Sequence, residues 1–261
     1  MPNSTHAMHP TGRLGITFTE EDHSYIDDFG IEYTSGTTLV HVAFEPFDAP
    51  KVAAAKSART GVPAMEYIRE WEENRDCAAD AGTRTHENCE RQILGRYADM
   101  NQPRDDEERA RFRAAWFEVE RMKANFETLE PEKLVFSPRF RASGSIDLMA
   151  RRRDGNYCMF DWKFIKELRR EAFGNRTGIH LATRHLPDCN FCHYGLQLNI
   201  YEQILKVEGY IPPTAAVDKF LAVYNRRTQA FDFVRMPDFG REALLLMAWN
   251  ATSDNLEDIP F

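Results

Sequence analysis

GSID, at residues 144–147, and DWK, at residues 161–163, are the two stretches that decide how this sequence is interpreted. A period of two runs through both segments and predicts two adjacent strands, which the polar DGN between them joins as a hairpin turn. Because side chains alternate along a strand, Asp161 and Lys163 share one face while Trp162 points into the core. We therefore expect Asp147, Asp161 and Lys163 to meet at neighbouring strand ends.

The composition predicts a folded protein with one sizeable core. The chain has 261 residues, of which 43% are hydrophobic and 12% aromatic, which argues against disorder. No apolar run approaches the length of a membrane span, and residues 1–12 lack the apolar stretch of a signal peptide, so we expect a cytoplasmic protein without a membrane segment. Five scattered cysteines do not indicate a disulfide framework.

The net charge of −8 argues mildly against a nucleic-acid partner, but binding depends on local potential. Basic residues flank both motifs, and acidic residues gather elsewhere, at 66–80 and 105–108. The flanking basic residues are Arg139, Arg141, Arg151, Arg152 and Arg153 around the first motif, and Lys166, Arg169 and Arg170 after the second.

The first half of the chain predicts a tail and then an elaboration of a larger domain. We expect a flexible tail at 1–13, a β-meander of short strands at 16–18, 24–26 and 31–33, and helices at 48–59, 64–97 (interrupted at 81–83) and 105–127. Residues 14–261 are predicted to form a single domain, with an N-terminal elaboration at 14–63 and the core at 64–253.

After Pro131 the period changes to two, which predicts the central strands. The expected elements are strands at 134–136, 146–149 and 157–163, a long loop at 169–190, an amphipathic helix at 194–207, a hairpin of 220–224 with 231–234, and a closing helix at 241–249. Together with the first half, this predicts an α/β fold.

Paired carboxylates beside a lysine suit phosphodiester hydrolysis. Hard cations such as Mg²⁺ and Mn²⁺ prefer carboxylate oxygens, and Asp147 and Asp161 can share one ion. The ammonium of Lys163 can orient the attacking water or neutralise developing charge. His86 and Glu90 are four apart on a predicted helix and can complete the coordination. An imidazole ligand favours Mn²⁺.

Four motifs in a fixed order resemble the PD-(D/E)xK nuclease superfamily, in its RecB-like exonuclease branch of phage and DNA-virus type. They are GT-x-x-H-x-x-x-E at 82–90, GSID at 144–147, DWK at 161–163 and QLNIY at 197–201. The resemblance covers about residues 80–208. It implies a restriction-endonuclease-like core, in which a mixed central sheet is flanked by helices.

The resemblance also implies roles for individual residues. His86, Asp147, Asp161 and the backbone carbonyl of Phe164 would bind metal, and Glu90 would be a further ligand. Lys163 would be the catalytic lysine. Gln197 and Tyr201 would lie beside the site and position Lys163 or the DNA, while loop residues Arg169, Arg176 and Arg184 would grip phosphates.

The function expected on this basis is a Mg²⁺- or Mn²⁺-dependent deoxyribonuclease using one or two ions. We expect an exonuclease that leaves 5′-phosphates in DNA replication, recombination or repair, with DNA ends and replication or recombination proteins as partners. Two alternatives stay open: a structure-specific, resolvase-like endonuclease, and a non-catalytic module that binds DNA ends with the same fold.

The cysteines offer another metal site. Some relatives hold an iron–sulfur cluster on one cysteine before the core and three after the Gln-x-x-x-Tyr helix, but here Cys189 and Cys192 precede Gln197 and no cysteine follows it. An iron–sulfur cluster is therefore not expected. With Cys77 and Cys89, a zinc site of four cysteines, or of three cysteines and a histidine, is conceivable. Such a site would make the chain a zinc-binding interaction protein.

Overall fold

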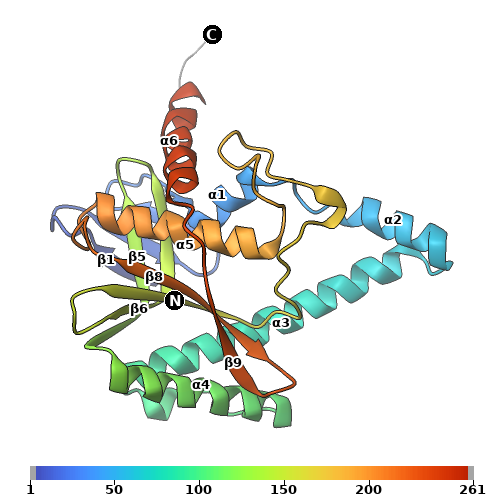
Figure 1. The fold of residues 1–261 in the computed structure, drawn as a ribbon, viewed down its shortest axis with the longest axis horizontal. Helices are drawn as coiled ribbons and strands as arrows, with labels where there is room; N and C mark the ends of the chain where they lie inside the picture. Colours follow the sequence, from blue (N-terminus) through green and yellow to red (C-terminus); the bar gives the residue numbers. More distant parts are fainter. Residues whose placement is uncertain (1–3, 258–261) are drawn as a thin grey trace.

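The computed structural model describes residues 4–257, with side chains to residue 252, and forms an α/β structure (Figure 1). The strands are β1 (Ser4–Met8), β2 (Gly15–Thr19), β3 (Ser24–Asp27), β4 (Thr34–Ser35), β5 (Thr128–Ser137), β6 (Ala142–Arg151), β7 (Tyr157–Lys163), β8 (Val217–Asn225) and β9 (Ala230–Arg235). The helices are α1 (Gly36–Ala43), α2 (Ala49–Thr60), α3 (Ala64–Ile93), α4 (Asp106–Asn125), α5 (Asn190–Val207) and α6 (Gly240–Glu257), with short 3₁₀ helices η1 (Tyr97–Asp99) and η2 (Phe173–Asn175).

The central sheet has six strands and is mixed. Strands β4, β6, β7, β8 and β9 follow one another across it, and β5 also pairs with β6. The β5–β6, β6–β7 and β8–β9 pairs are antiparallel, whereas β4–β6 and β7–β8 are parallel. The expected mixed sheet is therefore present.

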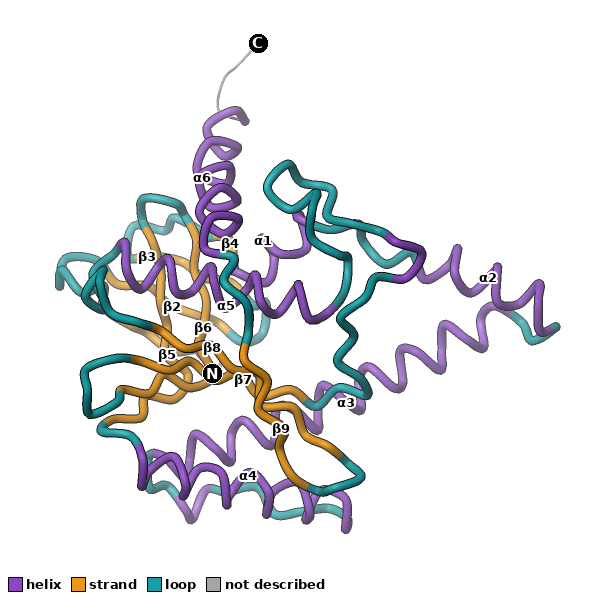
Figure 2. Tube along the Cα trace, viewed as in Figure 1, coloured by secondary structure: helices purple, strands orange, loops and turns teal. Residues whose placement is uncertain are grey.

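Helices cover both faces of this sheet (Figure 2). Met149, Met159 and Leu221 pack against α1, α5 and α6 on one face. Leu148, Phe160 and Trp162 pack against α3 and α4 on the other. Trp162 is 2% exposed, so it points into the core as the alternation within DWK predicts.

The N-terminal residues form a separate antiparallel sheet, β1–β2–β3. The prediction of a flexible tail at 1–13 is wrong for residues 4–8, which pair along β2, whereas residues 1–3 lie outside the described part of the chain. The β1 residues are mostly exposed, so backbone pairing rather than apolar periodicity holds this strand. The strand expected at 31–33 is reduced to one bridge between Glu32 and Ile26. Ile16 and Tyr25 pack on Phe136 of β5, which joins the two sheets.

Helix α3 is continuous over thirty residues, so the predicted interruption at 81–83 is wrong. Gly82 follows three strong helix formers, Ala78, Ala79 and Ala81, and one glycine costs only about 1 kcal/mol in a helix. The first half of α3 and all of α2 extend away from the body as a helical arm (Figure 1). No helix in the described part of the chain is both long and apolar enough to cross a membrane.

A buried carboxylate fixes α4 against the second half of α3. Glu108 is 2% exposed and accepts hydrogen bonds from Nε of Arg84 at 2.8 Å and from the backbone N–H of Arg104. Arg84 lies two residues before His86, so this network helps to set the position of that part of α3.

Candidate metal centre

Three acidic residues lie at neighbouring positions on three adjacent strands. The register pairs Pro131 with Leu148 and Lys133 with Ile146, so Glu132 of β5 lies opposite Asp147 of β6. On the other side, the β6–β7 ladder ends at the pair Leu148–Phe160, one step before Asp147 and Asp161. Asp147 was expected at a strand end, but it lies in the interior of β6.

Glu132, Asp147 and Asp161 form a row across β5, β6 and β7, and the strands are distorted there. Glu132 has a positive φ of 45°, which is unusual for a residue with a side chain. In β6, Ile146 packs on the α5 side of the sheet while Leu148 packs on the α3–α4 side, so the alternation of faces breaks between them. The carboxylate of Asp147 replaces the missing ladder bond by accepting the backbone N–H of Trp162 at 2.8 Å.

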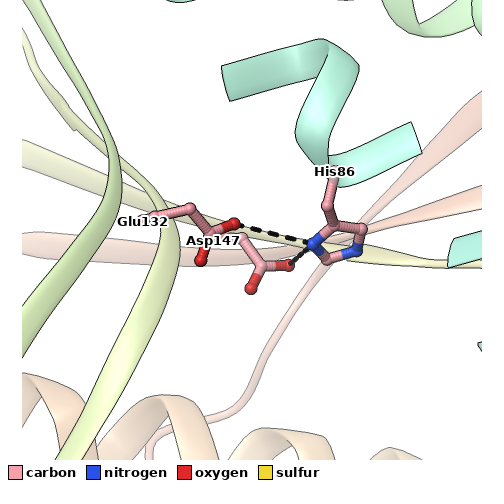
Figure 3. Close-up of side chains that lie close together, drawn as sticks. All are labelled: His86, Glu132 and Asp147. Atoms are coloured by element: carbon pink, nitrogen blue, oxygen red, sulfur yellow. Dashed lines mark ion pairs between the residues drawn. The ribbon is translucent and has the colours of Figure 1, made fainter. Parts of the chain in front are cut away.

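His86 reaches this row from α3. Its Nδ1 lies 3.4 Å from Asp147 Oδ2 and 3.8 Å from Glu132 Oε1 (Figure 3). Its Nε2 lies 3.1 Å from the carbonyl oxygen of Trp162, to which it can donate. Metal-binding histidines characteristically donate their second ring nitrogen in this way, because that bond fixes the ring and leaves the other lone pair free.

The donor atoms of His86, Glu132 and Asp147 all lie within 4.8 Å of one another and can hold one cation. Ser145 fixes Glu132 by donating to its Oε2 at 3.0 Å. One nitrogen and two carboxylate oxygens suit Mn²⁺, and the carboxylates also suit Mg²⁺. This donor set therefore fits the expected divalent ion.

The charges at the centre compensate one another. Burial lowers the pKa of His86, but Asp147 and Glu132 outweigh it and hold the pKa at about 9. Burial raises the pKa of Asp147, against the opposing effects of His86 and Lys163. The two carboxylates therefore favour the protonated form of His86.

Asp161 and Lys163 form an ion pair beside this centre. Their Oδ2 and Nζ atoms are 2.7 Å apart, and Nζ also lies 5.1 Å from the ring centre of Tyr194 on α5. Burial raises the pKa of Asp161 to about 6, although Lys163 opposes the rise. Burial would lower the pKa of Lys163, but Asp161 and Asp147 hold it above its usual value.

Asp161 is not among the three residues whose ligand atoms converge, and its role as a ligand stays a prediction. Glu90 lies one turn after His86, where burial and the charge of Glu132 raise its pKa, but it too lies outside the converging group. The carbonyl that meets His86 belongs to Trp162, whereas Phe164 contributes its ring, 6.0 Å from the imidazole.

Gln197 and Tyr201 are brought together on α5, with the amide of Gln197 donating to the Tyr201 hydroxyl at 2.9 Å. Tyr201 is only 3% exposed, so it supports the site and does not offer a surface for DNA. Its ring lies against Gly144 and Gly36: a Cβ on Gly144 would stand 2.3 Å from Cε1 of Tyr201. The glycine of GSID is thus required by the tyrosine of QLNIY.

The three loop arginines are exposed, but they differ in their partners. Arg176 pairs with Glu45 and Asp188, at 3.8 and 3.4 Å. Arg169 and Arg184 have no acidic partner within ion-pairing distance among the described residues. Their role in holding phosphates stays a prediction.

The cysteines do not converge on one site. Cys189 and Cys192 are buried with α5 on one face of the sheet, Cys89 is buried on the other face, and Cys77 is exposed. The conceivable zinc site built from all four is therefore contradicted by their positions.

Glu132 is the residue of the centre that sequence reasoning missed. The strand was expected to begin after Pro131, at residue 134, whereas β5 begins at Thr128. An acidic residue between Pro131 and an apolar run was the available signal, but it gives no register, and only the pairing with β6 places Glu132 opposite Asp147.

Comparisons with known proteins add little to this geometry. No protein-family model matches the sequence, and no curated protein matches it. Among solved structures, the chain is similar to a crystal structure named "Putative exonuclease" from Eubacterium rectale. The two are 13% identical, the match covers 69% of each chain, and the TM-score is 0.41. A similarity of this extent assigns neither a fold nor a function.

Proposed function

We propose that this protein is a divalent-metal-dependent deoxyribonuclease with a PD-(D/E)xK core. The observation that carries the proposal is the convergence of His86 Nδ1 with the carboxylates of Glu132 and Asp147, immediately beside the Asp161–Lys163 pair. A cation site and a fixed ammonium at one strand junction form the combination that phosphodiester hydrolysis needs.

The residues divide the chemistry between them. An Mg²⁺ or Mn²⁺ ion held here would polarise the scissile phosphate and activate water. Lys163 stays protonated because its pKa lies above the usual range, so it donates hydrogen bonds and positive charge and does not act as a base. Asp161 forms an ion pair with Lys163 and would keep its Nζ at the strand junction. Tyr201 and Gln197 brace the strand that carries Asp147.

Within this class we propose an exonuclease that acts on DNA ends and leaves 5′-phosphates, in replication, recombination or repair. The sequence resemblance supports this assignment. The loop cations Arg169 and Arg184 can hold the phosphates of the bound strand.

Digestion of end-labelled linear DNA and closed circular DNA, with Mg²⁺ and with Mn²⁺, tests the proposal. We expect linear DNA to be degraded to 5′-phosphorylated nucleotides while the circle survives. Loss of the circle would show an endonuclease, and no degradation of either DNA would contradict the proposed function. Asp147→Asn should be inactive. Glu130→Gln, which changes an exposed acid on the same strand as Glu132, should match the wild type.

A further inference from the structure

An open cavity of about 680 Å³ lies between the N-terminal helices and the loop that follows β7. Its walls come from α1, the start of α2, the loop between β7 and α5, and the first turn of α5, which Figure 2 shows on the same side of the molecule. The lining residues that matter below are Phe47, Val52, Phe173, His193, Arg169 and Arg176. We call this cavity the aromatic groove.

The aromatic groove connects to the centre through Tyr194 and Arg169. Tyr194 follows His193 in α5, and Lys163 Nζ lies 5.1 Å from its ring centre. The backbone of Arg169 is bonded to the first turn of α5, because its N–H donates to Asn190 Oδ1 at 2.8 Å and its carbonyl accepts from the N–H of Phe191 at 3.2 Å. The chain also runs from Lys163 to Arg169 in six residues. A DNA strand bound at the metal centre can therefore continue into the aromatic groove.

Two aromatic rings in the groove are open to solvent. Phe173 is 83% exposed and Phe47 is 62% exposed. Phe47 has an edge contact with Trp71 at 5.7 Å, while Phe173 has no ring partner among the described residues. Exposed rings are costly in water, and ring faces of this kind stack on nucleic-acid bases independently of sequence.

The charges that line the groove favour the binding of single-stranded DNA over double-stranded DNA. Its lining carries two arginines and three acids, Glu45, Glu171 and Asp188. Arg176 is occupied by Glu45 and Asp188, so Arg169 is the one lining cation without an acidic partner among the described residues. One free cation can hold one phosphate, but this lining would repel the two dense backbones of a duplex.

We propose that the aromatic groove binds unpaired nucleotides of the strand being cleaved. Bases stack on Phe173 and Phe47, and Arg169 holds the phosphate nearest to the metal centre. The volume lies within the range of small-ligand sites, about 300–1,000 Å³, so it accepts a few nucleotides. This inference rests on the proposed function and adds to it the substrate class, a single-stranded end.

Binding of a short fluorescent oligothymidylate in EDTA, followed by anisotropy, tests the groove without catalysis. We expect Phe173→Ala to weaken binding about fivefold or more, as the loss of one stacked base predicts. Arg169→Ala should weaken binding and lower the slope of log Kd against log salt by about 0.7, as expected for one lost phosphate contact. A blunt duplex should bind more weakly than the single strand.

Matched controls come from other faces of the molecule. Phe117 is 66% exposed on α4, and Arg153 is exposed in the turn at the opposite end of β7 from Lys163. Phe117→Ala and Arg153→Ala should bind like the wild type. Equal binding by all four variants, or equal binding of duplex and single strand, would contradict the proposal that the aromatic groove binds unpaired nucleotides.

The outcome for the groove is separable from the outcome for the proposed function. If the wild type degrades DNA but Phe173→Ala binds oligothymidylate as tightly as the wild type, the proposed role of the groove is refuted and the proposed nuclease activity is not. Protein that binds oligothymidylate through Phe173 and Arg169 but cuts no DNA with Mn²⁺ refutes the nuclease.

Discussion

Single residues at the centre have roles that their charges define. Lys163 is held as an ammonium by Asp161 and Asp147, and His86 is oriented by the Trp162 carbonyl. In the proposed mechanism the two side chains have different functions: the lysine would stabilise charge on the substrate, whereas the histidine would hold the ion. The two losses are therefore distinguishable by measuring catalysis and metal binding separately.

Lys163→Met should lower kcat on linear DNA by about 10²–10³-fold, the cost of losing one donor to developing charge. Mn²⁺ affinity should change little, because Lys163 is not a ligand. Steady-state hydrolysis and calorimetric titration measure the two effects. Lys166→Met alters an exposed lysine of the following loop and serves as the control. Retained activity in Lys163→Met would remove this lysine from the mechanism.

Glu132→Gln should weaken Mn²⁺ binding at least about tenfold, because it removes one anionic oxygen from the three converging ligands. Isothermal titration of Mn²⁺ into wild type, Glu132→Gln and Glu130→Gln measures this. Glu130 lies on the same strand but pairs with Lys133, so its variant should bind normally. Equal affinities for all three proteins would exclude Glu132 as a ligand.

Sequence reasoning placed His86 and Asp147 together, because ligand-type residues in a family order carry position as well as chemistry. It could not place Glu132, since the contact depends on the register between β5 and β6 and on a positive φ. Neither the register nor the positive φ produces a periodic pattern that could be recognised in the sequence. The alternation within DWK predicted that Asp161 and Lys163 share one face, but it did not predict that the expected ligand Asp161 would form an ion pair with Lys163.

Among the elements, α5 and β6 are matched to each other through the ring of Tyr201. Gly144→Ala should destabilise the protein by roughly 2 kcal/mol, because the new methyl meets the buried ring. Urea unfolding measures the loss. Gly82→Ala, where a Cβ meets only Phe164 at 3.5 Å, should be neutral or stabilising by up to about 1 kcal/mol.

A double variant shows whether the clash is the cause. Tyr201→Ala alone leaves a cavity and costs about 3 kcal/mol or more. If the Gly144 methyl collides with the Tyr201 ring, combining both changes should cost less than the sum of the two. Strict additivity would mean that Gly144 is needed for another reason.

The stability that Glu108 contributes at the junction of α3 and α4 should decrease in acid. Burial raises the pKa of Glu108, but Arg84 and Arg104 outweigh it and lower the pKa from 4.5 to about 2. A lowered folded-state pKa stabilises the protein above pH 4.5, and that contribution is lost as the pH falls from 4.5 toward 2.

Glu108→Gln should therefore cost roughly 2–3 kcal/mol at neutral pH, less than a fully buried pair because Arg104 is half exposed. The difference from the wild type should shrink as the pH approaches 2, and urea unfolding across pH follows it. A difference that is constant with pH would show that the charge of Glu108 does not stabilise this junction.

Element types were largely predictable, whereas continuity and pairing were not. The apolar period located β7 and α5, because both elements bury whole faces. Helix α3 runs through Gly82 after the alanines Ala78, Ala79 and Ala81, and β1 forms although its residues are mostly exposed. In both cases the surroundings along the chain or across the sheet outweigh the local signal.

In the whole molecule, two layers of helices hold a sheet whose distorted row joins distant parts of the sequence. Helix α3 delivers His86 from one face, while α5 delivers Tyr194 to Lys163 from the other. The mixed directions of the strands were implied by the family resemblance, whereas their order across the sheet was not predicted. The row of Glu132, Asp147 and Asp161 exists only once this order is set.

The central claim is that this protein hydrolyses DNA through a divalent cation, and one time course tests it most directly. Wild-type protein is incubated with linear DNA and Mn²⁺, EDTA is added in excess midway, and Mn²⁺ is then restored. The account predicts that degradation starts with Mn²⁺, stops with EDTA and resumes when Mn²⁺ is returned. Degradation that never starts, or that continues in EDTA, would contradict it.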